Sequence, residues 1–324
     1  MVYNLALATD RNYLRFVAVV LASLYENNRD ADTIIVHLLL NDVPDDLMCP
    51  LERQVADTNI HLKYYSVSDI QERFPVKVSC TLPITSMARL FLASILPPDV
   101  DRVLYVDCDT IFVGSVSELF DLGLDGKSIA GVLDTPGIGA KTGIGLADTD
   151  SYVNAGVLLI NLDFWRIHNL EGAFLEYIIN KKGSVVHNDQ GVINALCKDS
   201  KKVVGPQFNM QTSYYSHPYG YIAQTQSPCY SEYEIAAAKK HPVIIHFTEG
   251  YLGRPWRKGS KHPMAGQFLK YKEQTAWAKT PLDADNRTIA IKVLSWFFLN
   301  TPIPVYKSIE SIIGSLQRCW MKFR

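Results

Sequence analysis

Short apolar strand patterns alternate with helical patterns along the chain, and this alternation restricts it to a small set of folds. Helical patterns run from 13 to 26, from 85 to 95 and from 163 onward. Strand patterns cover residues 5–8, 33–40, 60–67, 102–106, 129–133, 155–162 and 242–247. Strands that alternate with helices are typical of an α/β protein with a mostly parallel sheet. We therefore predict such a sheet, flanked by helices, with a ligand site at the carboxyl ends of its strands.

The composition narrows the classes of protein to which the chain can belong. Its 324 residues suffice for one large domain or two smaller ones, and 48% hydrophobic with 20% charged residues is typical of a soluble globular protein. The formal net charge of −1 argues against a nucleic-acid partner, because a polyanion could bind only at a local basic patch. The 6 scattered cysteines favour reduced cytosolic thiols over a zinc site or a disulfide framework. The amino terminus has no basic start and no long apolar core, so we expect no signal peptide and a cytoplasmic location.

The end of the chain differs in character from the rest. Residues 289–299 are apolar, and beyond 300–304 apolar residues recur at helical spacing. Basic side chains lie off that apolar stripe at Lys307, Arg318, Lys322 and Arg324. A basic amphipathic helix is typical of a segment that lies on an anionic membrane surface, although a helix packed against its own domain would show the same pattern. We favour peripheral attachment to the cytoplasmic face of a membrane.

Asp107 and Asp109 directly follow the apolar strand pattern 102–106, where an unpaired carboxylate is costly to bury. Asp-x-Asp occurs five times in this chain, but the other four pairs lie in polar or turn-like surroundings. In an extended chain, residues two apart point to the same side at about 6–7 Å, so Cys108 would point into the protein. Two carboxylates at that spacing can hold one divalent ion, and Mg²⁺ and Mn²⁺ prefer such oxygen ligands. We predict a metal site at the end of this strand.

A basic segment follows the last strand pattern. Residues 251–272 contain six Lys or Arg and neither Asp nor Glu, and His246 lies just before them, near the end of the strand 242–247. A lone histidine is more often a core or surface residue than a ligand, but one that leaves a strand for a basic loop is a better candidate. The sequence has no G-x-G-x-x-G or Walker loop. Phosphates would therefore be held by a metal ion and basic side chains.

Six blocks of sequence occur in a fixed order along most of the chain. They are LALATDRNY (5–13), ITSMARL (84–90), LYVDCD (104–109), NAGVLLINL (154–162), HNDQGVIN (187–194) and HFTEGYLGRPW (246–256). Together they resemble the family 8 retaining glycosyltransferases, and within that family the bacterial lipopolysaccharide α-galactosyl- and α-glucosyltransferases. The resemblance implies a GT-A fold with a helical C-terminal extension. We expect a catalytic domain at 1–275 and, from the pattern of the final residues, a helical, basic amphipathic membrane-association segment at 276–324.

The resemblance also implies a role for each matching residue. Asp107, Asp109 and His246 would hold Mn²⁺, or Mg²⁺, against the two phosphates of a UDP-sugar. Asp189 and Gln190 would be the catalytic residues beside the anomeric carbon. The donor-binding residues would be Ala8, Thr9, Asp10, Asn12, Tyr13, Arg89, Asp107, Cys108, Asp109, Asp134, Asn154, Ala155, Asp189, Gln190, His246, Gly250 and Arg254. Among these, the residues at the amino terminus would contact uracil and ribose, and Asn154 and Ala155 would line the sugar.

Several of these residues also fit plainer structural roles. Arg89, taken alone, would be a charge on a helix surface. Asp189 and Gln190 could open a helix as an N-cap pair. Asn154 could end a turn before a strand. Only the shared order of the six blocks favours the functional roles.

The last block departs from the pattern of the family. Glu249 stands where the family commonly has a glycine, Gly250 follows it, and Arg254 replaces a lysine in a loop about two residues longer. Arginine can pair with phosphate as lysine does, but with a different reach. We keep His246, Gly250 and Arg254 as candidate donor residues.

The implied reaction moves galactose or glucose from a UDP-sugar to a hydroxyl of a glycan or glycolipid, with retention of the α configuration. Gln190 is an amide and a poor nucleophile, so we favour a front-face transfer over a covalent intermediate. Acceptor contacts would come from loops such as 75–84 and 210–230, where the aromatic stretch 213–221 could stack on sugars or simply pack as a loop. The alternatives are a soluble relative that glucosylates a protein, as glycogenin-like relatives do, a non-catalytic carbohydrate-binding relative, and a glycoside hydrolase, which would need neither metal nor basic segment.

Overall fold

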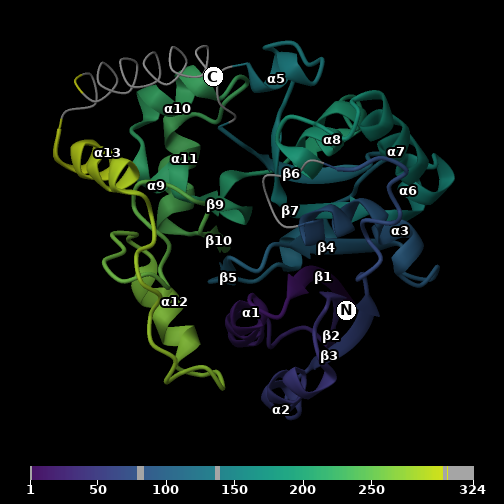
Figure 1. The fold of residues 1–324 in the computed structure, drawn as a ribbon, viewed down its shortest axis with the longest axis horizontal. Helices are drawn as coiled ribbons and strands as arrows, with labels where there is room; N and C mark the ends of the chain where they lie inside the picture. The colour runs from purple at the N-terminus through teal and green to yellow at the C-terminus, as the bar shows by residue number, and fades with distance from the viewer. Residues whose placement is uncertain (1, 79–83, 136–138, 302–304, 306–324) are drawn as a thin grey trace.

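A seven-stranded sheet forms the centre of the protein in this computed structural model, which describes residues 2–78, 84–135, 139–301 and 305 (Figure 1). The strand order is β3-β2-β1-β4-β7-β6-β8. The strands are β1 (Val2–Asp10), β2 (Thr33–Asn41), β3 (Ile60–Ser66), β4 (Arg102–Val106), β6 (Ile129–Leu133), β7 (Val153–Asn161) and β8 (Lys201–Val203). Neighbouring strands are parallel, except that β7 runs antiparallel to both β4 and β6. The predicted α/β fold with a mostly parallel sheet is confirmed.

Helices cover both faces of this sheet. Successive residues of a strand point to opposite sides, so the apolar strands present buried side chains to both layers of helices. On β4, Leu104 and Val106 join a core with α1 (Leu14–Asn27), α2 (Cys49–Val55) and α4 (Ser117–Asp121). Val103 and Tyr105 face the other layer. That layer contains α3 (Leu92–Ile95), α6 (Leu162–Ile167), α7 (Leu170–Asn180) and α8 (Asn188–Leu196). The double cover explains why the central strands read as continuous apolar runs.

The strand pattern at 242–247 does not belong to the main sheet but to a second sheet of three strands. Its order is β5-β10-β9, and its strands are β5 (Thr110–Phe112), β9 (Met210–Gln211) and β10 (Ile244–His246). The strand predicted at 242–247 is therefore shorter than expected and lies outside the main sheet. The antiparallel pairing of β10 with β5 sets His246 opposite Thr110, the residue after Asp109. The pattern at 85–95 also differs, because a 3₁₀ helix, Ile84–Phe91, precedes the short α3.

The remaining helices pack around this frame. They are η1 (Asp45–Leu47), α5 (Ala140–Gly143), η3 (Pro206–Phe208), α9 (Thr212–Ser216), α10 (Tyr219–Thr225), α11 (Glu232–Lys240), α12 (Ala265–Lys272) and α13 (Ile289–Asn300). Helix α12 lies beside α1 (Figure 1), where the Asn27 amide donates to the Tyr271 hydroxyl at 2.9 Å. Arg15 of α1 holds Asp283 through two hydrogen bonds of 3.0 and 2.7 Å. Contacts to α1 thus continue past residue 275, and the division of the chain at 275/276 stays a prediction.

Helix α13 carries the apolar run 289–299. The Thr288 hydroxyl caps it by accepting from the backbone N–H of Ile291 at 3.3 Å. Phe298 is buried, whereas Ile289 and Trp296 are exposed. The basic amphipathic pattern predicted beyond this helix falls on residues 306–324, which lie outside the described part of the chain. Among the described residues, no helix combines the length and the apolar character needed to cross a membrane.

Candidate active site

A cavity of about 770 Å³ opens where β1 and β4 end. Its lining includes every predicted donor-binding residue except Asn12. These residues come from segments far apart in the chain, since Ala8 lies on β1, Asn154 on β7 and Gln190 on α8. The sequence blocks therefore converge on one cavity at the predicted edge of the sheet. The role of each residue in it stays a prediction.

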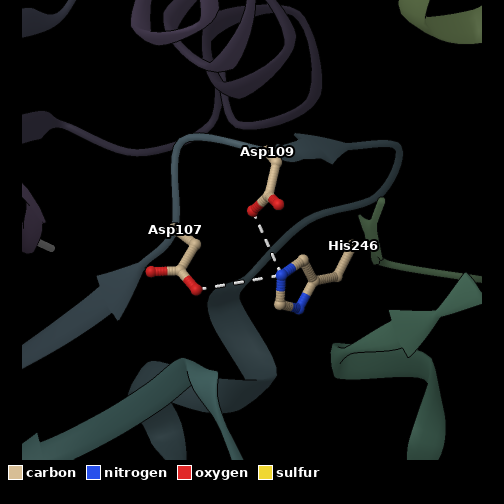
Figure 2. A group of neighbouring side chains, drawn as sticks. All are labelled: Asp107, Asp109 and His246. Carbon is tan, nitrogen blue, oxygen red and sulfur yellow. Dashed lines mark ion pairs between the residues drawn. The ribbon is translucent and has the colours of Figure 1, made fainter. Parts of the chain in front are cut away.

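Asp107, Asp109 and His246 form a cluster in the lining of this cavity (Figure 2). Both carboxylates face the same ring nitrogen, with Nε2 of His246 3.1 Å from Asp109 and 3.8 Å from Asp107. One ligand atom of each residue lies within 4.8 Å of the others. The expected extended Asp-x-Asp is instead a turn between β4 and β5, but the Cys108 thiol does point inward and donates to the Ala8 carbonyl at 3.3 Å. Two carboxylates and an imidazole suit a divalent ion such as Mn²⁺ or Mg²⁺.

Two basic side chains contact the carboxylate of Asp109. Nη2 of Arg254 lies 3.1 Å from its second carboxylate oxygen, opposite the contact with His246. Burial alone would raise the pKa of Asp109, but the charges of His246 and Arg254 hold it at about 2. Burial opposes protonation of His246, yet Asp109 raises the pKa of that imidazole above its usual range. A metal ion bound here would displace the imidazole proton, because only the neutral ring offers a lone pair.

Arg89 balances the acids on the other side of the cluster. Its guanidinium lies 2.8 Å from Asp107 and 2.9 Å from Asp189, and it also donates to the Ala155 carbonyl. The side chain is only 4% exposed. The alternative in which Arg89 is a helix-surface charge is therefore wrong. It lines the cavity but is bound to two carboxylates, so its predicted contact with a donor stays untested.

Asn209 orients the ring of His246 from behind, and no sequence pattern had indicated it. Its amide NH₂ donates to Asn154 at 2.9 Å, which turns its oxygen toward Nδ1 of His246 at 3.1 Å. Nδ1 therefore carries a proton, and Nε2 remains to face the carboxylates. Asn209 is fully buried. Such partners of a metal-binding histidine fix its tautomer and ring position.

We expect Asn209→Ala to weaken metal binding by about 10- to 100-fold, because the ring of His246 loses the group that fixes its tautomer. Asn209→Asp should retain most of the affinity, since a carboxylate also accepts the Nδ1 proton. Isothermal titration with Mn²⁺ would measure both, with thermal unfolding to show that each variant is folded. Equal affinities in wild type and Asn209→Ala would contradict this role.

Gln190 also lines the cavity, with its amide orientation fixed. Its oxygen accepts from the backbone N–H of Ala155 at 3.0 Å and from Asn154 at 3.3 Å. Its nitrogen donates to Asp134 at 2.8 Å. The hydroxyl of Tyr152 lies 3.4 Å from the same nitrogen. A carboxylate, two amides and a phenol thus form one network, which offers donors and acceptors to a polar ligand.

Some of the residues predicted to contact a nucleobase and ribose line the cavity, and one does not. Asp10 accepts from the backbone N–H groups of Asn12 and Tyr13 at 2.8 and 3.1 Å, so its carboxylate closes the turn into α1. Ala8, Asp10 and Tyr13 line the cavity, whereas Asn12 does not. The Tyr13 hydroxyl also accepts from Arg254 at 3.4 Å.

Gly156 is a second residue that the sequence analysis missed. A Cβ at this position would lie 2.1 Å from Cε1 of His246 and 2.7 Å from the carboxylate of Asp107. The sequence did carry a signal for it, since a glycine inside a strand pattern often marks a place where another group comes close to the backbone.

Part of the aromatic stretch 213–221 also lines the cavity, at His217 and Tyr221, whereas Tyr214 is buried in the core. Packing is thus observed at Tyr214, and stacking of this stretch on a sugar stays a prediction.

Comparison with known proteins places this geometry in a family. The model of "Glycosyl transferase family 8" matches residues 4–259. General stress protein A of Bacillus subtilis (strain 168) is 23% identical over 284 residues, which is 85% of this chain and 95% of that protein. Lipopolysaccharide 1,2-glucosyltransferase of Escherichia coli (strain K12) is 26% identical over 292 residues, which is 87% of this chain and 81% of that protein. The solved structure of galactosyltransferase LgtC with donor and acceptor sugar analogues superimposes with a TM-score of 0.69 at 24% identity, over 85% of this chain and 96% of that one.

Proposed function

The chain belongs to glycosyl transferase family 8, and from this we propose that it moves a hexose from a UDP-sugar to a hydroxyl of a glycan or glycolipid. The observation that carries the proposal is the cluster of Asp107, Asp109 and His246 in the lining of a large cavity. A glucosyltransferase and a galactosyltransferase are among the similar proteins. They support glucose or galactose as the transferred sugar.

The metal cluster and Arg254 would together hold the diphosphate. The three ligands of the cluster fit Mn²⁺ or Mg²⁺, and Arg254 is the cation beside Asp109. When bound, the ion would supply a Lewis acid that stabilises the charge on the leaving diphosphate. Arg254 is largely buried and already placed. It would add positive charge to the diphosphate without reorganisation during the reaction.

The network around Gln190 would hold the sugar. The bond from the anomeric carbon to the diphosphate oxygen would break as the acceptor oxygen bonds to the same face. This attack on the face of departure would retain the α configuration, and the acceptor proton would pass to the departing diphosphate oxygen. Two N–H donors already engage the Gln190 oxygen, which argues against nucleophilic attack by this atom.

A lipid-linked or lipopolysaccharide acceptor and attachment to the cytoplasmic face of a membrane extend this proposal. The exposed apolar residues of α13, among them Ile289 and Trp296, and the basic pattern beyond residue 305 support them. A chain truncated after residue 288 should then no longer pellet with anionic vesicles. Unchanged pelleting would contradict attachment through this segment.

The donor is tested by UDP release from a panel of UDP-sugars, with Mn²⁺ and again with excess EDTA. We expect release from UDP-galactose or UDP-glucose that EDTA abolishes. The preferred donor would also identify the sugar. Absence of release with every donor, together with absence of metal-dependent UDP binding, would contradict the proposal.

Gln190→Ala is expected to lower kcat by about 10²-fold, because the removed amide would act on charge that develops only in the transition state. The affinity for UDP should change little, since Gln190 is not one of the three residues of the metal cluster. Steady-state kinetics and UDP titration would separate the two effects. Gln267→Ala, on the exposed surface of α12, is the matched control. Loss of UDP affinity without loss of kcat would contradict this placement.

A further inference from the structure

Strand β7 extends past the end of β4, and side chains of α8 take the place of the missing strand. The ladder between β4 and β7 stops at Val106 and Val157. Beyond this point, toward the first residue of β7, the Ala155 N–H donates to Gln190 and the Val153 N–H donates to Asn194 at 2.8 Å. The Asn194 amide also donates back to the Val153 carbonyl at 2.7 Å. Residues four apart on a helix share a face, so Gln190 and Asn194 fix α8 along the edge of β7 together.

Lys201 of β8 fixes the orientation of the Asn194 amide. Its ammonium donates to the side-chain oxygen of Asn194 at 3.0 Å, to the backbone carbonyl of Asn194 at 3.2 Å and to that of Ser151 at 2.7 Å. Asn194 is fully buried and Lys201 is 9% exposed. A flipped amide would direct its NH₂ group at the ammonium and at the Val153 N–H, which are both donors. The charge of Lys201 thus permits only one orientation.

We propose that Lys201 and Asn194 are positioning residues that hold α8 on β7 and thereby set the position of the Gln190 amide in the cavity. The inference rests on the proposed function of Gln190. Neither residue lines the cavity, so neither touches a ligand there. Their effect would be on the chemical step and not on binding of the nucleotide.

The protonation of Lys201 supplies a readout that simple packing would not. Burial lowers the pKa of Lys201 to about 8, and the positive charge of Lys141 acts in the same direction. Cys197, Asp150 and Asp199 oppose this shift, because each favours the charged ammonium. Its three acceptors require three N–H groups, whereas a neutral amine has two. Above about pH 8 one of these hydrogen bonds is lost, and kcat should fall.

Stability should change in the opposite direction over the same range. The unfolded chain keeps lysine protonated up to a pKa of about 10.4, so it binds more protons than the folded chain above about pH 8. The free energy of unfolding therefore gains from this group as pH rises. A fall in kcat without a fall in stability would separate positioning from packing.

The test compares Lys201→Met with Lys202→Met. Lys202 is the next residue of β8, but its ammonium donates to the Gly123 carbonyl at 2.7 Å and is partly exposed. We expect Lys201→Met to lower kcat at least about tenfold, with a donor KM within about threefold of wild type and no alkaline fall between about pH 7 and 9.5. Lys202→Met should behave as wild type.

Unchanged kcat in folded Lys201→Met, or equal losses in both variants, would overturn the inference while leaving the proposed function intact. If Lys201→Met does not fold, the wild-type profile decides, and a flat kcat up to about pH 9.5 overturns the inference. A wild-type protein inactive with every UDP-sugar would overturn the proposed function, and the inference with it.

Discussion

Asp109→Asn is expected to lower the transfer rate by about 10³-fold, or about 4 kcal/mol of transition-state stabilisation. Asp109 is the most enclosed acid of the metal cluster, 9% exposed, and it contacts both His246 and Arg254 at 3.1 Å. An amide in its place is a weaker ligand, and it leaves Arg254 without this carboxylate. The metal ion would lose a ligand, and Arg254 would keep its contacts with Glu249 and Tyr13.

The kinetics of Asp109→Asn can be set against Asp99→Asn, an exposed member of another Asp-x-Asp pair. Asp99→Asn should transfer at the wild-type rate. Metal affinity, measured in parallel, should fall only in Asp109→Asn. A variant at position 109 that kept its rate and its metal affinity would remove the cluster from the mechanism.

Gly156→Ala is expected to reduce metal affinity by about 10²-fold or more, although it adds a single methyl group. The new Cβ would lie 2.1 Å from Cε1 of His246, so the ring or the strand must move. The ring has little freedom, since it is 3% exposed and bound to Asn209. Displacement of His246 separates Nε2 from the two carboxylates, and the loss of a ligand or its support costs affinity on this scale.

Gly266→Ala provides the matched control for this substitution. A Cβ at Gly266, on α12, would meet nothing within 4 Å. It should bind metal as wild type does. Circular dichroism would show whether Gly156→Ala keeps its fold. A folded Gly156→Ala with wild-type metal affinity would mean that the metal is not held at His246.

The sequence was sufficient to predict the layer that carries the site. The apolar run before Asp107 predicted β4, and acids directly after a buried strand indicated the edge of a sheet where ligands bind. The order of the blocks then placed Gln190 and His246 with them in one cavity. These predictions succeeded because each strand or helix follows from a local pattern of residues. The alternation of strands and helices then leaves only a few possible topologies.

The supporting contacts could not be predicted in the same way. Asn209 supports His246 only because β9 and β10 pair in parallel, with Gln211 beside His246, and no pattern around a two-residue strand indicates that. Arg89 had the sequence context of a surface charge, yet Asp107, directly after β4, and Asp189 of α8 contact it in the interior. Such contacts join segments far apart in the chain, so they follow from the assembled fold and not from any local period.

The proposed reaction depends most directly on metal binding at the cluster of Asp107, Asp109 and His246. Titration of the protein with Mn²⁺, followed by electron paramagnetic resonance with and without UDP, measures it without any acceptor. We predict a single ion per chain whose affinity UDP raises by at least about tenfold, and whose binding Asp109→Asn removes. Binding that is absent, or that neither UDP nor Asp109→Asn alters, would contradict the account.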